Sequence, residues 1–251
     1  MIGQGYPDTP GLHSDEQIAA WRKVTDAVHA EGGTIFAQLM HTGRIGHPSL
    51  LPDGLLPVGP SAVAAQGQVF THDGMKAFVT PKELTEAEIA QTITDFADAA
   101  RNAIAAGFDG AELHGANGYL IHQFLAPNAN LRTDGWGGSV ASRIRLGVEV
   151  TTAVVEAIGG HRTGFRISPG NPLNDIAETD PSDVERTYTS LPAPVGGPRP
   201  RPDEAVAQGL AGRVRPQPVH TPRTDRQGLP QPHRGRHRGH DRLRCDVSRQ
   251  P

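Results

Sequence analysis

Three polar side chains that could do chemistry lie within a span of six residues: His114, Asn117 and Tyr119. They follow the short apolar run 108–113, which is typical of a buried strand. In α/β proteins, the loops at the carboxyl ends of the strands carry the active site. Neutral His and Asn can donate hydrogen bonds to a carbonyl oxygen, and Tyr, with a pKa of about 10, can donate a proton at neutral pH. The cluster therefore predicts a functional site.

Helix caps and apolar spacing predict four helices around this cluster. Ser14, Thr85 and Ser139 are N-cap residues of three of them, and Thr85 forms a capping box with Glu88. Ser182 is predicted to open a fourth, shorter helix. The apolar face expected for the first helix consists of Ile18, Trp21, Val24 and Val28.

Each predicted strand comes directly after a helix and is followed by a long loop. The strands are expected over 34–40, 107–113 and 163–168, and a hairpin over 68–79 has its turn near Asp73. Long strand-to-helix loops on one side are typical of a (β/α)8 TIM barrel, whose loops build the site at one face. A doubly wound sheet is the alternative, but no GxGxxG motif lies between a strand and a helix.

Alternation along the strands places Gln38, His114 and Arg166 on equivalent faces. An inward amide and guanidinium need polar partners, and the edge of a planar heterocycle with carbonyl and N–H groups would satisfy both. Each residue also has a simpler explanation. Gln38 could make an ordinary strand-end hydrogen bond, Arg166 could pair with Glu112, and His114 could be a satisfied core histidine.

Four segments together resemble the Old Yellow Enzyme family of flavin-dependent (β/α)8-barrel ene-reductases, to which N-ethylmaleimide reductases belong. The segments are FAQLMHTGR (36–44), HGANGYLIHQFL (114–125), NANLRTDGWGGS (128–139) and GFRISP (164–169). The resemblance extends from about Gly5 to Leu191, with the segments in the family's order. It implies an FMN-dependent oxidoreductase that uses NAD(P)H to reduce activated alkenes such as enones, maleimides and nitro compounds.

The resemblance also implies roles for single residues. Gln38 would bind the pyrimidine side of FMN, and Arg166 would lie near its N1 and O2 atoms. His114 and Asn117 would bind the carbonyl or nitro oxygen of the alkene. Tyr119 would be the catalytic proton donor, and Tyr6 matches an aromatic residue of the substrate pocket.

Residues 1–191 and 192–251 differ so much in composition that we expect two domains of different kind. The first part carries 12 Lys and Arg against 22 Asp and Glu, and the second carries 12 Arg and no Lys against 5 acids. The second part also lacks aromatic residues, Met, Ile and Asn, so we expect a disordered Arg/Pro-rich tail. The missing residue types have AT-rich codons, which predicts out-of-frame translation of a GC-rich gene.

The chain is therefore expected to be a truncated, frameshifted family member with an incomplete barrel, its central strands only, over 1–191. Three strands alone are expected to bind FMN weakly or not at all. A non-catalytic remnant with a basic, nucleic-acid-binding tail is the alternative, although we do not expect a nucleic-acid partner.

Other function classes are less well supported. The single cysteine, Cys245, excludes a disulfide within the chain, and we expect no membrane span and a cytoplasmic location. A metal-dependent barrel hydrolase would have to use histidines without the expected carboxylate ligands, so we predict no metal site. The histidines considered for it are His41, His47, His114 and His122.

Overall fold

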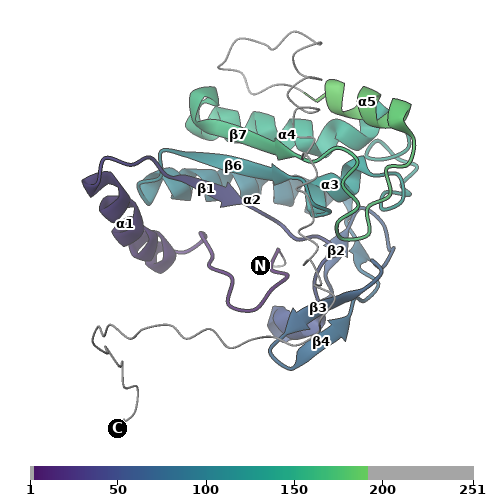
Figure 1. Cartoon of the computed structure of the whole chain (residues 1–251), viewed down its shortest axis with the longest axis horizontal. Helices are drawn as coiled ribbons and strands as arrows, with labels where there is room; N and C mark the ends of the chain where they lie inside the picture. The colour runs from purple at the N-terminus through teal and green to yellow at the C-terminus, as the bar shows by residue number, and fades with distance from the viewer. Residues whose placement is uncertain (1–2, 192–251) are drawn as a thin grey trace, which may run out of the picture. The chain divides into compact units, whose positions relative to one another are not determined.

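Three parallel strands form the central sheet of residues 3–191, the part of the chain that the computed structural model describes. They are β1 (Phe36–Leu39), β6 (Gly110–Gly115) and β7 (Thr163–Ile167), in the order β1-β6-β7 (Figure 1). Each strand lies at its predicted place in the sequence. The predictions for 192–251 fall outside the described residues.

Two long helices connect the strands and cover one face of the sheet (Figure 1). α2 (Glu86–Ala105) joins β1 to β6, and α4 (Val140–Ile158) joins β6 to β7. Both begin at the predicted caps, since the side chains of Thr85 and Ser139 each accept a backbone N–H of the first turn. The buried core between sheet and helices includes Leu39, Leu113, Phe96, Leu146 and Val150.

The other face of the sheet is not covered by these helices. Alternation along β1 buries Ala37 and Leu39 and leaves Phe36 and Gln38 exposed. A βαβαβ unit with helices on one face only is the arrangement of consecutive strands in a (β/α) barrel, in which the bare face turns toward the barrel axis.

The first helix, α1 (Asp15–Ala30), has the predicted Ser14 cap and packs on the core through Ile18 and Trp21 of the predicted apolar face, but Val24 departs from the prediction. Val24 is 43% exposed, whereas Thr25 is fully buried. The Thr25 hydroxyl donates a hydrogen bond to the carbonyl oxygen of Ala106 at 2.7 Å. Thr25 therefore takes the place predicted for Val24 in the packed face of the helix.

The remaining elements are short. The predicted hairpin is present, with its turn at the predicted place, and a second two-stranded ladder pairs segments that are distant in the sequence. These strands are β3 (Gln68–Thr71) with β4 (Gly74–Ala77) and β2 (Val58–Gly59) with β5 (Lys82–Glu83). Three 3-10 turns lie at Pro48–Leu50, Pro52–Gly54 and Gly160–Arg162. No helix within the described residues has the length and apolarity that a membrane crossing requires.

Two short helices differ from expectation. α3 (Leu120–Leu125) lies inside the segment that was expected to be a loop, and all six of its residues are buried. α5 (Pro181–Thr189) is capped by Asp180, two residues before the predicted opening residue Ser182. The Asp180 side chain accepts the backbone N–H of Ser182, and Pro181 suits the first helical position because it has no N–H to satisfy.

Candidate active site

The chain makes a tight turn directly after β6, and this turn carries the predicted site residues. Asn117 (φ 56°) and Gly118 (φ 77°) both adopt the left-handed conformation. The Asn117 N–H donates to the Ser168 hydroxyl oxygen at 2.8 Å, and its carbonyl oxygen accepts from the Asn174 side chain at 2.8 Å. The Asn117 side-chain oxygen accepts from Asn171 at 3.2 Å. The loop after β6 is therefore fastened to the loop after β7.

Alanine at Gly118 is expected to destabilise the protein more than alanine at Gly170, although both have positive φ. A Cβ at Gly118 would lie 2.5 Å from the Leu173 carbonyl oxygen, whereas a Cβ at Gly170 would meet no described atom within 4 Å. We expect Gly170→Ala to cost about 1 kcal/mol for its φ alone and Gly118→Ala about 2 kcal/mol more. Urea unfolding of both variants measures the difference. Equal costs would show that the close approach to Leu173 is unimportant.

His114, the last inward-facing residue of β6, is 4% exposed and lies opposite Arg166 in the strand register. Its Nδ1 atom is buried and has no hydrogen-bond partner among the described residues. Burial, followed by the positive charge of Arg166, lowers the pKa of His114. The ring is therefore neutral at neutral pH and keeps one nitrogen available for a ligand.

Tyr119 lies beside His114 and contacts Tyr6 from the N-terminal segment. The ring centroids of His114 and Tyr119 are 5.1 Å apart. The hydroxyl oxygens of Tyr6 and Tyr119 are 3.0 Å apart, with the two rings edge to face. Burial, and then the hydrogen bond with Tyr119, raises the pKa of Tyr6, so Tyr6 keeps its proton. The predicted substrate-pocket tyrosine thus meets the predicted proton donor.

Glu112 brings the two predicted flavin-binding residues together on the bare face of the sheet. Gln38 donates to one carboxylate oxygen of Glu112 at 2.6 Å, and Arg166 donates to both oxygens at 2.8 and 3.2 Å. Burial opposes ionisation of Glu112, but the bonds from Arg166 and Gln38 outweigh it and lower its pKa. The ion pair considered as the simpler explanation for Arg166 is therefore present.

The lowered pKa of Glu112 leads to a prediction about acid stability. Because this pKa lies below the ordinary value of 4.5, the carboxylate stabilises the folded state above that pH. The contribution is lost as the pH falls through the lowered value. We expect Glu112→Gln to be less stable than wild type near neutral pH and the difference to shrink as the pH falls below about 4. Urea unfolding between neutral and acid pH tests this, and a constant difference would contradict it.

The histidines considered for a metal site serve other purposes. Three of the four use Nδ1 to accept a nearby backbone N–H: His41, His47 and His122. Among residues 3–191, no three His, Cys, Asp or Glu side chains lie close enough together to hold a metal ion. The structure therefore gives no support to the hydrolase hypothesis.

Gln123 connects the loop after β1 with the site turn, a role that the sequence did not reveal. This side chain is fully buried. Its oxygen accepts the Arg44 N–H at 3.0 Å, and its nitrogen donates to the carbonyl oxygens of Thr42 at 3.0 Å and Gly118 at 2.7 Å. The polar pair His122 and Gln123 between apolar neighbours in 120–125 was the sequence signal that could have identified it.

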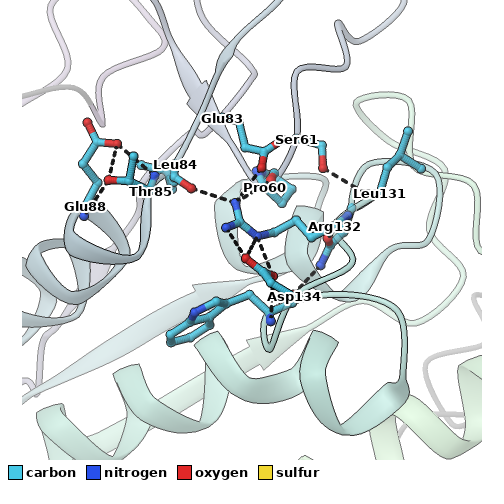
Figure 2. Close-up of polar contacts among 11 residues, drawn as sticks. Pro60, Ser61, Glu83, Leu84, Thr85, Glu88, Leu131, Arg132 and Asp134 are labelled. Carbon is cyan, nitrogen blue, oxygen red and sulfur yellow. Dashed lines mark hydrogen bonds and ion pairs between the residues drawn. The ribbon is translucent and has the colours of Figure 1, made fainter.

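Arg132, which lies in the loop between α3 and α4, is the centre of a second buried polar cluster (Figure 2). Its side chain, 5% exposed, binds the Asp134 carboxylate through Nε and Nη2, the latter at 2.6 Å. Nη1 donates to the carbonyl oxygens of Pro60 at 3.0 Å and Leu84 at 2.7 Å. Glu83 lies 3.2 Å from the same nitrogen. Arg132 therefore connects three segments of the chain, at Pro60, Leu84 and Asp134.

Comparison with known proteins assigns the chain to a family. The model of the NADH:flavin oxidoreductase / NADH oxidase family matches residues 1–191. The chain belongs to this family. A 12-oxophytodienoate reductase 1 from Oryza sativa subsp. japonica is 45% identical over 178 residues, which are 71% of this chain and 46% of that protein. A probable flavin mononucleotide-dependent alkene reductase from Leishmania infantum is 48% identical over 185 residues, 72% of this chain and 51% of that protein.

Solved structures show the same relationship. An old yellow enzyme homologue from Zymomonas mobilis superposes with a TM-score of 0.72 at 42% identity, over 75% of this chain and 53% of that one. Morphinone reductase in complex with tetrahydroNAD gives a TM-score of 0.70 at 42% identity, over 73% and 52%. The sequence resemblance to Old Yellow Enzymes is thus confirmed, and the fold is part of their TIM barrel. The chain spans about half the length of these relatives.

Proposed function

We propose that this member of the NADH:flavin oxidoreductase family reduces activated alkenes, such as enones, maleimides and nitro compounds, with NAD(P)H as reductant. The observation that carries the proposal is that neither ring nitrogen of His114, which lies beside the Tyr119 ring, has a hydrogen-bond partner among the described residues. A hydrogen-bonding atom that the described protein leaves unsatisfied is a natural contact for a ligand oxygen, because an unsatisfied buried polar group is costly.

FMN is the cofactor that the family implies, and the sheet residues fit it. Gln38 and Arg166 lie on the uncovered face, and the Arg166 side chain is 51% exposed. An amide and a guanidinium match the carbonyl and ring-nitrogen edge of a flavin, so these two residues would hold it there. The positive charge of Arg166 favours negative charge at that edge. When bound, FMN supplies the two-electron reduction of the alkene.

The chain's own residues would act on the substrate from the turn after β6. Because Asn171 occupies the side-chain oxygen of Asn117, the Asn117 amide nitrogen is left as a donor. Asn117 and the neutral His114 would donate to the carbonyl or nitro oxygen and stabilise the negative charge that develops on it. Tyr119 would donate the proton to the α-carbon. Tyr6, whose hydroxyl contacts that of Tyr119, would fix the orientation of the donor.

The proposal is tested with purified protein and FMN in excess, because we expect weak FMN binding. NADH and NADPH are supplied separately, and consumption of an enone is followed without oxygen. We expect turnover above that of free FMN, and His114→Ala should raise the KM for the enone. The matched control is His161→Gln, which changes an exposed histidine away from the turn. Turnover equal to that of free FMN with both reductants would reject the proposal.

A further inference from the structure

A buried polar network below the site turn has no part in the chemistry proposed so far. His122 of α3 is 0% exposed, and its Nδ1 accepts the backbone N–H of Gly118 at 3.0 Å. Its Nε2 lies 2.9 Å from the Tyr188 hydroxyl oxygen and 3.4 Å from a Glu178 carboxylate oxygen. The network thus connects the turn after β6, through α3, to the loop before α5.

The contact with Gly118 determines which nitrogen of His122 carries the proton. A backbone N–H can only donate, so the Nδ1 atom that accepts it must be unprotonated. The neutral ring then carries its proton on Nε2, the atom that faces Tyr188 and Glu178. A proton on Nδ1 would oppose the Gly118 N–H and break this bond.

Glu178 is suited to enforce this arrangement. Its side chain is 3% exposed and accepts hydrogen bonds from the Tyr188 hydroxyl at 2.9 Å and the Gly170 N–H at 2.7 Å. Burial would raise the pKa of Glu178, but the bonds from its neighbours, His122 first, outweigh burial and lower it. The resulting carboxylate can only accept, so the proton of His122 is kept on the nitrogen facing it.

The turn needs such support because it places two consecutive residues in the left-handed conformation. That conformation is unfavourable for Asn117, which is not glycine, and persists where surrounding contacts fix it. The Gly118 N–H is held by His122 and the Gly118 carbonyl oxygen by Gln123. Tyr119 follows directly, so its position depends on the same turn.

We propose that His122 and Glu178 are positioning residues that hold the Asn117–Gly118 turn, and with it Tyr119, in place for the substrate. The benefit to catalysis rests on the proposed function, whereas the arrangement of the turn does not. His122 acts through the backbone of Gly118, and Glu178 acts through the tautomer of His122.

The tautomer is measured in the wild-type protein by long-range ¹H–¹⁵N NMR of labelled histidines. We expect His122 to show an unprotonated Nδ1 and a protonated Nε2. Loss of the signal in His122→Leu assigns it. A protonated Nδ1 in the wild-type protein would overturn the proposal, whether or not the protein reduces alkenes.

A second measurement follows amide hydrogen exchange at Gly118. In Glu178→Gln the side-chain amide can donate to Nε2, so the His122 proton should move to Nδ1 and exchange at Gly118 should become about tenfold faster. His161→Gln is the control and should leave Gly118 unchanged. An unchanged tautomer and exchange rate in Glu178→Gln would overturn the proposal. Failure of alkene reduction together with the expected tautomer would reject only the proposed function.

Discussion

Replacing Tyr119 by phenylalanine is expected to slow alkene reduction by about 10²- to 10⁴-fold, the range that a positioned general acid contributes. The substitution removes the hydroxyl but keeps the ring that packs 5.1 Å from His114. The binding of the substrate oxygen that we propose for His114 and Asn117 should be retained. The KM for an enone should therefore change much less than kcat, which steady-state kinetics with FMN in excess will separate.

A matched acceptor distinguishes loss of the proton donor from general damage to the site. Ferricyanide accepts single electrons and needs no proton at carbon, so its reduction should proceed at the same rate in Tyr119→Phe and wild type. If both acceptors slow equally, Tyr119 serves the structure of the site. If neither slows, another group supplies the proton, and the role proposed for Tyr119 is wrong.

Replacing Arg132 by alanine is expected to lower the free energy of unfolding by about 3 kcal/mol, because removing one partner of a buried ion pair leaves its polar neighbours unsatisfied. The carbonyl oxygens of Pro60 and Leu84 would lose a charged donor (Figure 2). The Asp134 carboxylate, 40% exposed, would lose its partner but could be partly hydrated, which limits the loss. Urea unfolding measures the change.

Arg101 provides the control for this prediction. Its side chain is 55% exposed and pairs with Asp98 on the surface of α2. Exposed pairs of this kind contribute less than about 1 kcal/mol, so Arg101→Ala should change the unfolding midpoint little. Similar losses in the two arginine variants would mean that the Arg132 cluster does not join the loops as the structure indicates.

Local signals predicted the framework of this fold well. Ser14, Thr85 and Ser139 cap the helices that they were predicted to cap. These predictions succeeded because a cap depends only on residues within one helical turn. The run 108–113 was equally informative, since the alternating Ala111 and Leu113 face the buried core of the strand. Contacts across the sequence were harder to predict. β2 and β5 have two residues each, too few for any alternating pattern.

Two features of the site, α3 and the contacts of Glu112, could not be predicted from the sequence. The six residues of α3 are all buried, so they show no polar face from which a helical period could be recognised. The pair between Glu112 and Arg166 was foreseen only as an alternative, because alternation places both on one face without fixing the distance between them. That Gln38 shares the same carboxylate follows from the strand register, in which Gln38 lies opposite Glu112.

The bonds that tie Asn117 to Ser168, Asn171 and Asn174 have a practical meaning for protein engineering. Segments 116–119 and 168–174 behave as one unit, since each supplies the polar partners of the other. Transplanting either segment alone into another protein would leave these amide and hydroxyl groups without hydrogen-bond partners. Attempts to graft this candidate site should therefore exchange both segments together.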